Sequence, residues 1–310
     1  MILLSGGTGT PKLLAGMREV IPEEEITVIV NTAEDTIVSG NLVCPDIDTV
    51  LYLLSGAIDA AKWWGIRDDT FATHEYLKGI GHHEIMQIGD MDRATHILRS
   101  DLIRSGCTLT EAICELTRRF GIRATVLPMT DNEVATHIAT PDGVMHFQEY
   151  WITHQGEPDA LDVQIREIED AKPSDAVLAA LNSDDRVVIG PSNPITSIGP
   201  IIKLQGMREI LRRKRVVAIS PIIGGAPVSG PAGKLMRACG YDVSSAGVLE
   251  CYGDILDTFI IDQMDVGIGD ETGVGGVGIV RADTMMSSVD KSKALSRVVV
   301  DALEGLDGVC

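Results

Sequence analysis

Two aspartates one residue apart stand where a polar stretch leads into an apolar helical pattern, in the segment PDIDTVLYLL. Asp46 and Asp48 at this spacing could share a divalent cation or hold a hydroxyl group that attacks a substrate. Asp48 could instead simply cap the N-terminus of the helix, a common role of aspartate. Because asparagine caps about as well, we expect Asp48→Asn to leave stability nearly unchanged, so that a loss of kcat would mark a catalytic role.

A glycine-rich loop, SGGTGTPK at residues 5–12, lies between an apolar strand and a helical pattern. Glycine lets the backbone approach a ligand closely, and the free N–H groups at the start of a helix attract anions. Thr8 and Thr10 add hydroxyl donors. Lys12 adds a positive charge. The spacing is neither a Walker A loop nor GxGxxG, so a tight turn without a ligand is the alternative.

Two more polar loops follow apolar strands in the second half of the chain. Ser192 and Asn193 belong to GPSNPITS after the expected strand 187–189, and the glycine-rich segment 220–234 follows the expected strand 216–219. The carboxyl ends of parallel strands lie at one edge of a sheet, where α/β proteins bind ligands. Together with the first loop, these segments favour a nucleotide-like ligand at that edge.

The second expected strand ends in NTAED, residues 31–35. In a dinucleotide-binding fold, an acid here, Glu34 or Asp35, would hold a ribose hydroxyl group. A nicotinamide-dependent oxidoreductase is therefore one alternative, although it leaves Asp46, Asp48 and both later loops unexplained.

A second acidic cluster occurs in GDMDRATH, residues 89–96. Asp90, Asp92 and Arg93 stand where a helix is expected to begin, so helix capping and a surface ion pair explain them. His96 lies inside the same helix, where a lone histidine is more often a hydrogen-bonded structural residue than a catalyst.

The adjacent Trp63 and Trp64 stand out in a chain with only 4% aromatic residues. Paired tryptophans could line a pocket for a flat ring. For at least one of them, anchoring the surrounding segment is the simpler role.

Short Val- and Ile-rich runs alternate with helical patterns, which predicts an α/β fold with a parallel sheet covered on both faces. The expected strands are residues 2–4, 26–30, 187–189, 216–219 and 259–261. We expect a nucleotide-binding core from residues 1–55 and 171–310. Residues 56–170 would form an inserted α+β subdomain, with helices followed by an antiparallel meander at 124–129, 134–139 and 144–151. The glycine-rich stretch 267–278 predicts a mobile loop.

Composition excludes several classes of function. With 26 Lys and Arg against 45 Asp and Glu, the net charge is −19, which argues against a nucleic-acid or anionic-membrane surface. A phosphate ligand stays possible, because backbone N–H groups or a bound metal can neutralise it. No CxxC pair, export signal or membrane-spanning stretch occurs, so we expect a cytoplasmic protein with reduced thiols.

Seven motifs carry a resemblance to one known family, which runs from the first strand to about Leu256. They are GGTGTPKLL, VNTAED, CPDIDTVLYLL, KWWGI, GDMDRATHILR, GPSNPITSIGPI and SPIIGGAPVSGPAGKLM. These motifs resemble the 2-phospho-L-lactate transferases, the CofD family, and the resemblance resumes near residues 281–284. It implies a Rossmann-like, doubly wound, mostly parallel sheet with an inserted subdomain, and a homodimer.

The resemblance also implies a reaction in the biosynthesis of coenzyme F420. The phospholactyl group of lactyl-2-diphospho-5′-guanosine would pass to the ribityl hydroxyl of the deazaflavin alcohol 7,8-didemethyl-8-hydroxy-5-deazariboflavin (Fo). The products would be F420-0 and GMP, and Mg²⁺ would be required. Such a transfer needs alignment and charge stabilisation more than a protein nucleophile. The sequence leaves open whether the acid is phospholactate or a relative such as phosphoenolpyruvate.

Carried onto this chain, the resemblance implies that the glycine loop holds the diphosphate and that Asp46 and Asp48 handle Mg²⁺ and the Fo hydroxyl. Gln87 would line the Fo site, at a position that is usually basic. The residues expected to bind substrate are Gly6, Gly7, Thr8, Gly9, Lys12, Asn31, Asp48, Gln87, Ser192 and Asn193. Asp46 and Asp48 are the expected catalytic and metal-binding residues.

A non-catalytic regulator that binds a nucleotide sugar is a further alternative, because regulatory relatives resembling gluconeogenesis factors share the glycine-rich start. The segment from KWWGI to GDMDRATH favours the transferase, since it is the expected Fo-binding insertion.

Overall fold

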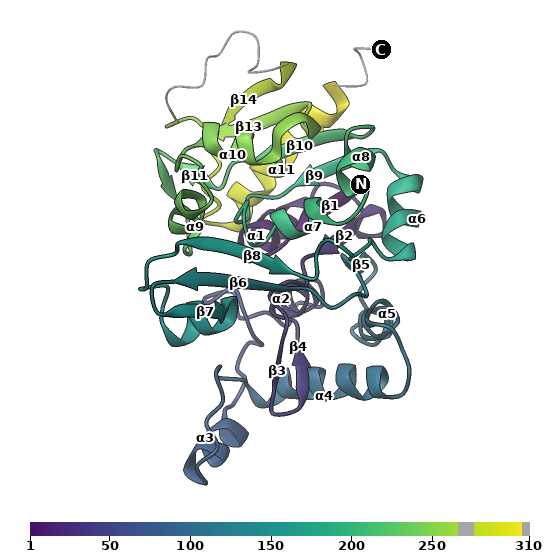
Figure 1. Cartoon of the computed structure of the whole chain (residues 1–310). Coiled ribbons are helices and arrows are strands. Elements are labelled where there is room, and N and C mark those ends of the chain that lie inside the picture. Colours follow the sequence, from purple (N-terminus) through teal and green to yellow (C-terminus); the bar gives the residue numbers. More distant parts are fainter. Residues whose placement is uncertain (266–275, 306–310) are drawn as a thin grey trace.

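A seven-stranded sheet forms the centre of the protein in the computed structural model, which describes residues 1–265 and 276–305 (Figure 1). The strand order is β14-β13-β10-β9-β1-β2-β5, and every neighbouring pair is parallel. The strands are β1 (Ile2–Ser5), β2 (Thr27–Val30), β5 (Thr125–Pro128), β9 (Arg186–Ile189), β10 (Arg215–Ile219), β13 (Thr258–Asp262) and β14 (Gly278–Ala282). The predicted α/β fold with a parallel sheet is confirmed.

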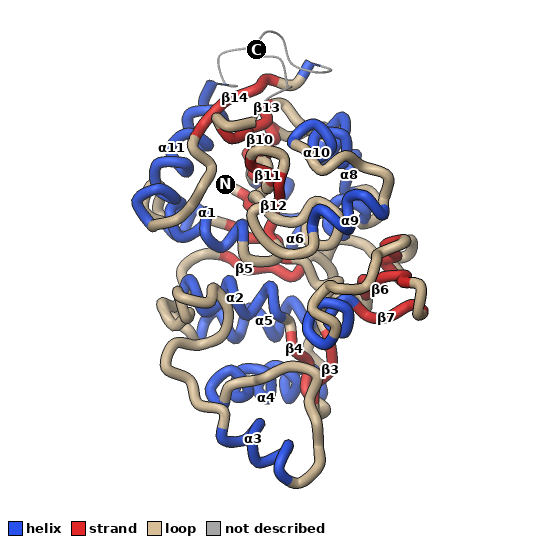
Figure 2. The backbone as a smooth tube through the Cα atoms, turned by 90° about the vertical axis from the view of Figure 1, so that its left-hand side faces the viewer, coloured by secondary structure: helices blue, strands red, loops and turns tan. Residues whose placement is uncertain are grey.

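Successive residues of a strand point to opposite faces of the sheet, and in this protein both faces are buried. Ile2 and Leu4 belong to one hydrophobic core and Leu3 to the other. Figure 2 shows the resulting layers, with helices on either side of a central column of strands. One face packs against α1 (Gly9–Met17), α2 (Pro45–Leu54), α5 (Leu109–Arg119) and α11 (Val289–Gly305). The other packs against α6 (Asp175–Ser183), α7 (Gly199–Lys203), α8 (Met207–Leu211), α9 (Ala232–Ala238) and α10 (Ser245–Tyr252).

The strand order reverses at β1. From β1 the chain adds β2 and β5 on one side, then β9, β10, β13 and β14 on the other. In open parallel sheets, a crevice forms outside the carboxyl ends of the strands at such a reversal. The glycine loop, which directly follows β1, therefore lies at the expected ligand crevice.

The predicted antiparallel meander is wrong in its first strand. β5 pairs with β2 in the central sheet, because Val126 and Leu127 are buried on opposite faces in the two cores. The small antiparallel sheet has the order β7-β6-β8, with β6 (Ala135–Thr140), β7 (Gly143–His146) and β8 (Asp162–Arg166). The strand expected at 144–151 ends early, since Trp151 lies in the π-helix η2 (Glu149–Thr153).

A lobe beyond the central sheet is built from a hairpin and two helices, at the end of the molecule opposite β14 (Figure 1). Its elements are β3 (Thr36–Val38), β4 (Asn41–Val43), α3 (Ala72–Gly79) and α4 (Asp90–Arg104). The two helices cap each other. Asp90 accepts from the N–H groups of Ala72 and Thr73, and Asp69 accepts from those of Met91 and Asp92.

Arg93 forms an ion pair with Glu84, but the two side chains are largely buried, so the expected surface location of the pair is wrong. The range 56–170 thus contains both this lobe's helices and β5 of the central sheet. The remaining short elements are η1 (Glu23–Glu25), β11 (Ile222–Ile223), β12 (Ala226–Pro227) and η3 (Gly253–Ile255).

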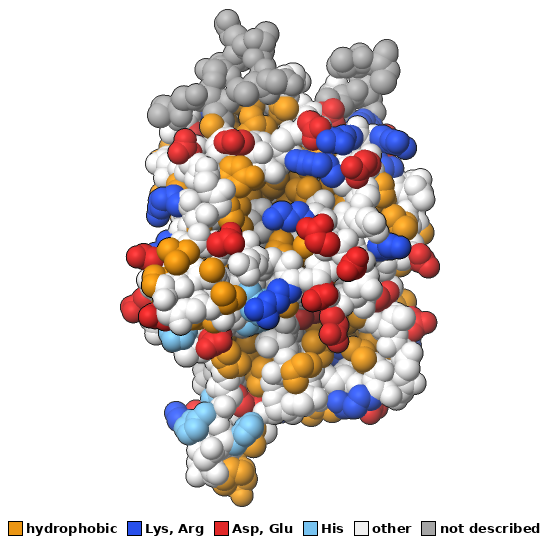
Figure 3. Space-filling view, viewed as in Figure 1, with side chains coloured by type: hydrophobic (Ala, Val, Ile, Leu, Met, Phe, Trp, Pro, Cys, Tyr) orange, Lys and Arg blue, Asp and Glu red, His pale blue; other side chains and the backbone are white. Residues whose placement is uncertain are grey.

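Within the described ranges, no helix has the length and apolar character needed to cross a bilayer. The five cysteines in that part of the chain are all unpaired. Figure 3 shows acidic side chains interspersed with basic ones over the visible face, without a continuous basic surface on its described part. Most of the predicted loop 267–278 lies outside the described residues.

Candidate active site

A cavity of about 610 Å³ opens at the carboxyl edge of the sheet, where the glycine loop, the start of α2 and the loops after β9 and β10 meet. It brings together most of the residues expected from the sequence. Those that line it are Gly7, Thr8, Gly9, Lys12, Asp46, Asp48, Gln87, Ser192 and Asn193. Gly6 and Asn31 do not line it, but each is hydrogen-bonded to a residue that does: Gly6 to Ser192 and Asn31 to Asp46.

The glycine loop is packed against the loop that follows β9. A Cβ atom on Gly9 would lie 1.9 Å from the carbonyl oxygen of Pro191, and one on Gly6 would lie 2.6 Å from Cβ of Ser197. Gly7 has φ +56°, a left-handed conformation that glycine adopts without strain. Gly6 and Gly9 are therefore required by the close packing of the two loops, whereas Gly7 is required by its backbone conformation.

The Ser192 hydroxyl group is used inside the protein. It donates to the carbonyl oxygen of Gly6, accepts from the N–H of Thr10 at 3.1 Å and lies 2.8 Å from the Thr10 hydroxyl. Ser192 therefore fixes the glycine loop, whereas the N–H groups of Thr8 and Gly9 have no acceptor in the described part of the chain.

Asp46 lies in the first turn of α2 and is buried. One of its oxygens accepts from the N–H of Gly7 at 2.7 Å, and the other accepts from Nδ2 of Asn31 at 3.0 Å. Burial raises the pKa of Asp46 to about 6, although both hydrogen bonds oppose the rise. Burial and the charge of Asp46 also raise the pKa of Glu34, which lines the cavity and whose Oε1 has no hydrogen-bond partner.

Asp48 is held by more donors than Asp46. Arg99 donates to both of its oxygens, at 2.6 and 3.0 Å, while Oδ2 also accepts from the N–H of Cys44 at 3.3 Å. Burial alone would raise the pKa of Asp48, but the Arg99 charge and His96 hold it well below its usual range. Capping explains only the bond to Cys44, so it is not the sole role of Asp48.

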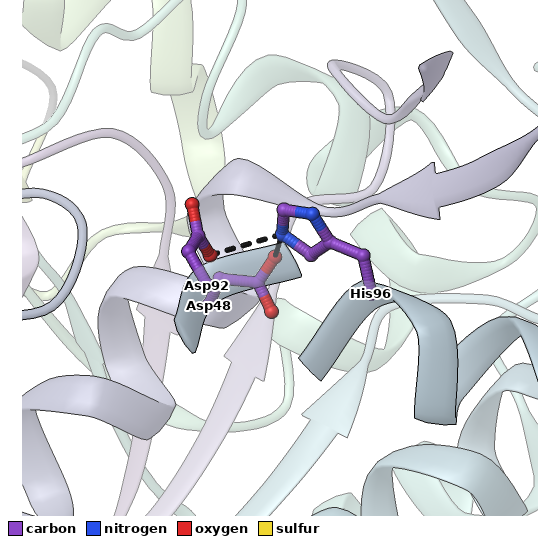
Figure 4. A group of neighbouring side chains, drawn as sticks. All are labelled: Asp48, Asp92 and His96. Carbon is purple, nitrogen blue, oxygen red and sulfur yellow. Dashed lines mark hydrogen bonds and ion pairs between the residues drawn. The ribbon is translucent and has the colours of Figure 1, made fainter. Parts of the chain in front are cut away.

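His96 joins two carboxylates, as Figure 4 shows. Its Nε2 lies 3.1 Å from Oδ2 of Asp48 and 3.0 Å from Oδ1 of Asp92, which also accepts from the Tyr52 hydroxyl at 2.6 Å. Burial would lower the pKa of His96, but the two carboxylates raise it to about 9. His96 is therefore a cation in a hydrogen-bonded network, which agrees with its expected structural role and places that network in the cavity wall.

Sequence reasoning missed Arg99. It stands three residues after His96 in the motif GDMDRATHILR, and residues at this spacing share one face of a helix. Arg99 is fully buried and also donates to the carbonyl oxygen of Leu42 in β4. Its position on the face of α4 that carries His96 was the available signal.

Much of the cavity lining is apolar. Gln87 lines it together with Met86 and Ile88. The aromatic residues that line it are Tyr52, Trp64, Phe147 and Trp151. Trp64 therefore lines the cavity, whereas Trp63 does not and contacts Lys12 instead.

Comparison with known proteins identifies the family. The family described as "2-phospho-L-lactate transferase CofD" matches residues 1–288. The chain belongs to the CofD family. It is 58% identical to the 2-phospho-L-lactate transferase of Methanosarcina barkeri over 302 residues, which cover 97% of each chain. It is 44% identical to that of Methanocaldococcus jannaschii over 303 residues, covering 96% of each.

A solved structure shows the same fold as this CofD family member. A UPF0052 family protein from Bacillus halodurans superposes with a TM-score of 0.67 at 20% identity, covering 96% of this chain and 98% of the other. At this identity the likeness concerns the fold. The family predicted from the seven motifs is confirmed, and the relatives described here give no support to an oxidoreductase or a regulator.

Proposed function

We propose that the chain is a 2-phospho-L-lactate transferase of coenzyme F420 biosynthesis. It would transfer the phospholactyl group of lactyl-2-diphospho-5′-guanosine to the ribityl hydroxyl of Fo and release GMP. The observation that carries the proposal is that one cavity is lined by the glycine loop, by buried carboxylates and by aromatic and other apolar side chains that suit a flat ring. Relatives at 57–58% identity bear this activity in their names.

The charges around the cavity support a divalent cation. Lys12 is the only Lys or Arg among the described residues that line it, whereas four lining residues are carboxylates: Glu34, Asp46, Asp48 and Asp92. The other cation of the lining, His96, is already bonded to Asp48 and Asp92, so among the described lining residues Lys12 is left to meet a diphosphate, and a divalent cation would supply further positive charge.

Asp46 and Glu34 fit Mg²⁺ better than Asp48 does. Each Asp46 oxygen accepts one hydrogen bond and Oε1 of Glu34 accepts none, so lone pairs remain for a hard cation. The Asp48 oxygens already face Arg99, His96 and the Cys44 N–H. Mg²⁺ held there would shield the charge of the diphosphate and of the departing GMP.

The residues of the chain would then align the two substrates. The free N–H groups of Thr8 and Gly9 and the Lys12 ammonium would bind the diphosphate, and Asn193 would border the nucleotide. Asp48, kept in one orientation by Arg99, would accept a hydrogen bond from the Fo hydroxyl and direct its oxygen toward phosphorus. Gln87 would offer its amide to a polar group of the deazaflavin.

The test is direct product identification. The purified protein is incubated with Fo, Mg²⁺ and either guanylylated lactate or guanylylated phosphoenolpyruvate, and the products are identified by mass. Formation of GMP together with F420-0 or its dehydro form supports the proposal and selects the acid. Absence of both products with folded protein would overturn it. A homodimer, which the resemblance implies, is part of the proposal and is checked by sedimentation. The cytoplasmic location expected from the sequence is part of it too and is checked by cell fractionation.

A further inference from the structure

Trp63 has an unusual backbone and an unusual partner. Its φ of +62° lies in the left-handed region, which a bulky residue adopts only when its surroundings impose it. The turn around it imposes this conformation: the Trp63 N–H donates to the carbonyl oxygen of Asp59, and the Asp59 N–H donates to that of Gly65. The indole ring is thereby placed against α1, with Lys12 Nζ 5.6 Å from its centroid.

Lys12 carries an uncompensated charge. It lines the cavity, and it forms no ion pair with a carboxylate in the part of the chain that the structure describes. Lys62 provides the contrast. It lies 5.2 Å from the Trp64 ring centroid, yet its ammonium is also paired with Asp59 at 3.2 Å. The ring of Trp63 is thus the contact that holds Lys12.

An ammonium over an aromatic face is attracted to the ring and still has N–H donors that point away from it. A lysine side chain without such a contact samples many rotamers and loses that freedom when it binds an anion. A ring that already restrains the lysine lowers this loss, so the anion binds more tightly.

We propose that Trp63 is a positioning residue for the substrate diphosphate, which it serves by holding the Lys12 ammonium at the glycine loop. This inference rests on the proposed function, because it assumes that the cavity binds a guanosine diphosphate ester. It also separates the roles of the two tryptophans: Trp64 forms part of the cavity wall, whereas Trp63 acts through Lys12.

A double-mutant cycle on GDP binding tests the inference without catalysis. Calorimetry with GDP and Mg²⁺ compares the wild type, Lys12→Met, Trp63→Leu and the double variant. We expect Lys12→Met to weaken binding about tenfold and Trp63→Leu about threefold. The double variant should bind no more weakly than Lys12→Met alone, because the ring acts only through the ammonium.

Three further variants make the result specific. Trp63→Phe keeps an aromatic face and should bind GDP within about twofold of wild type. Trp63→Met, which has no ring, should match Trp63→Leu and replaces it should the leucine variant not fold. Lys62→Met removes the other stacked lysine and should leave GDP affinity unchanged.

The possible failures are distinguishable. Should the wild type bind GDP while the losses from Lys12→Met and Trp63→Leu add, Trp63 is only structural and the inference is overturned. The same holds if Trp63→Phe binds as weakly as Trp63→Leu. A folded wild type that binds no GDP would overturn the proposed function, and this inference with it.

Discussion

Arg99 and Asp48 form a buried, two-pronged ion pair, with Nη1–Oδ1 and Nη2–Oδ2 distances of 2.6 and 3.0 Å. The pair ties helix α4 of the outer lobe to the first turn of α2 at the sheet edge. The outer lobe and the core are therefore joined through a side chain that also lines the cavity.

Removing Arg99 should destabilise the protein strongly. Arg99→Met leaves the buried Asp48 carboxylate with His96 as its remaining cation, which should lower the free energy of unfolding by about 3–5 kcal/mol. Arg99→Lys keeps the charge but loses the fork geometry and should cost less. Urea unfolding at pH 7 checks both values. Equal stability of Arg99→Met and wild type would show that the pair does not hold the lobe.

Asp48→Asn should be more destabilising than Asp46→Asn, contrary to the near-neutral effect expected from capping. Asparagine at position 48 leaves the fully buried Arg99 without its counter-ion, at a cost of about 3 kcal/mol. The donors to Asp46 are the neutral Gly7 N–H and the Asn31 amide, so Asp46→Asn should cost about 1 kcal/mol. Urea unfolding of the two variants gives the comparison, and equal losses would contradict it.

Alanine should destabilise the protein more at Gly9 than at Gly7. A Cβ atom on Gly9 meets the Pro191 carbonyl oxygen at 1.9 Å, so the two loops must separate and the cost should exceed about 2 kcal/mol. Gly7→Ala suffers mainly from its φ of +56°, at about 1 kcal/mol. In thermal unfolding, the Tm of Gly9→Ala should lie below that of Gly7→Ala. The reverse order would show that the loops are not packed as described.

Acid should loosen the outer lobe through Glu84. Hydrogen bonds from Arg93 at 2.8 and 2.7 Å lower the pKa of Glu84 to about 2, below its ordinary value of 4.5. A lowered pKa stabilises the fold above pH 4.5, and this contribution is lost as the pH falls from about 4.5 to about 2. The protection factors of the α3 and α4 amides in hydrogen exchange should fall between these pH values in the wild type. Glu84→Gln should have lower protection factors at neutral pH and lack that fall, whereas parallel profiles would argue against the role of Glu84.

Removal of Mg²⁺ should abolish turnover. Lys12 is the one lysine among the described lining residues and His96 is already bonded to two carboxylates, so the diphosphate and the departing GMP need a further counter-ion. Activity should vanish after exhaustive EDTA treatment and return with excess Mg²⁺, and GDP affinity should fall in parallel. Full turnover in the metal-free protein would require another source of positive charge.

Much of the fold and part of the site followed from local patterns. Val- and Ile-rich runs that end in Gly, Ser or Asn predicted the parallel strands and the loops at their carboxyl ends. The order of these loops then placed Asp46, Ser192 and the glycine loop at one edge. The placement of β5 did not follow, because an apolar strand does not specify its partner. Pairing with β2 depends on burying Val126 and Leu127 against two separate cores.

The sequence by itself determined the fold class, the family and several of the residues that line the cavity, because strand and helix periodicity and the seven motifs are all local along the chain. Only the tertiary structure decided how those residues are used. Arg99 is 51 positions from Asp48, and Ser192 is 182 positions from Thr10. Whether a carboxylate is an available ligand or the partner of a buried cation depends on such long-range contacts, since burial and neighbouring charges set its free lone pairs and its pKa.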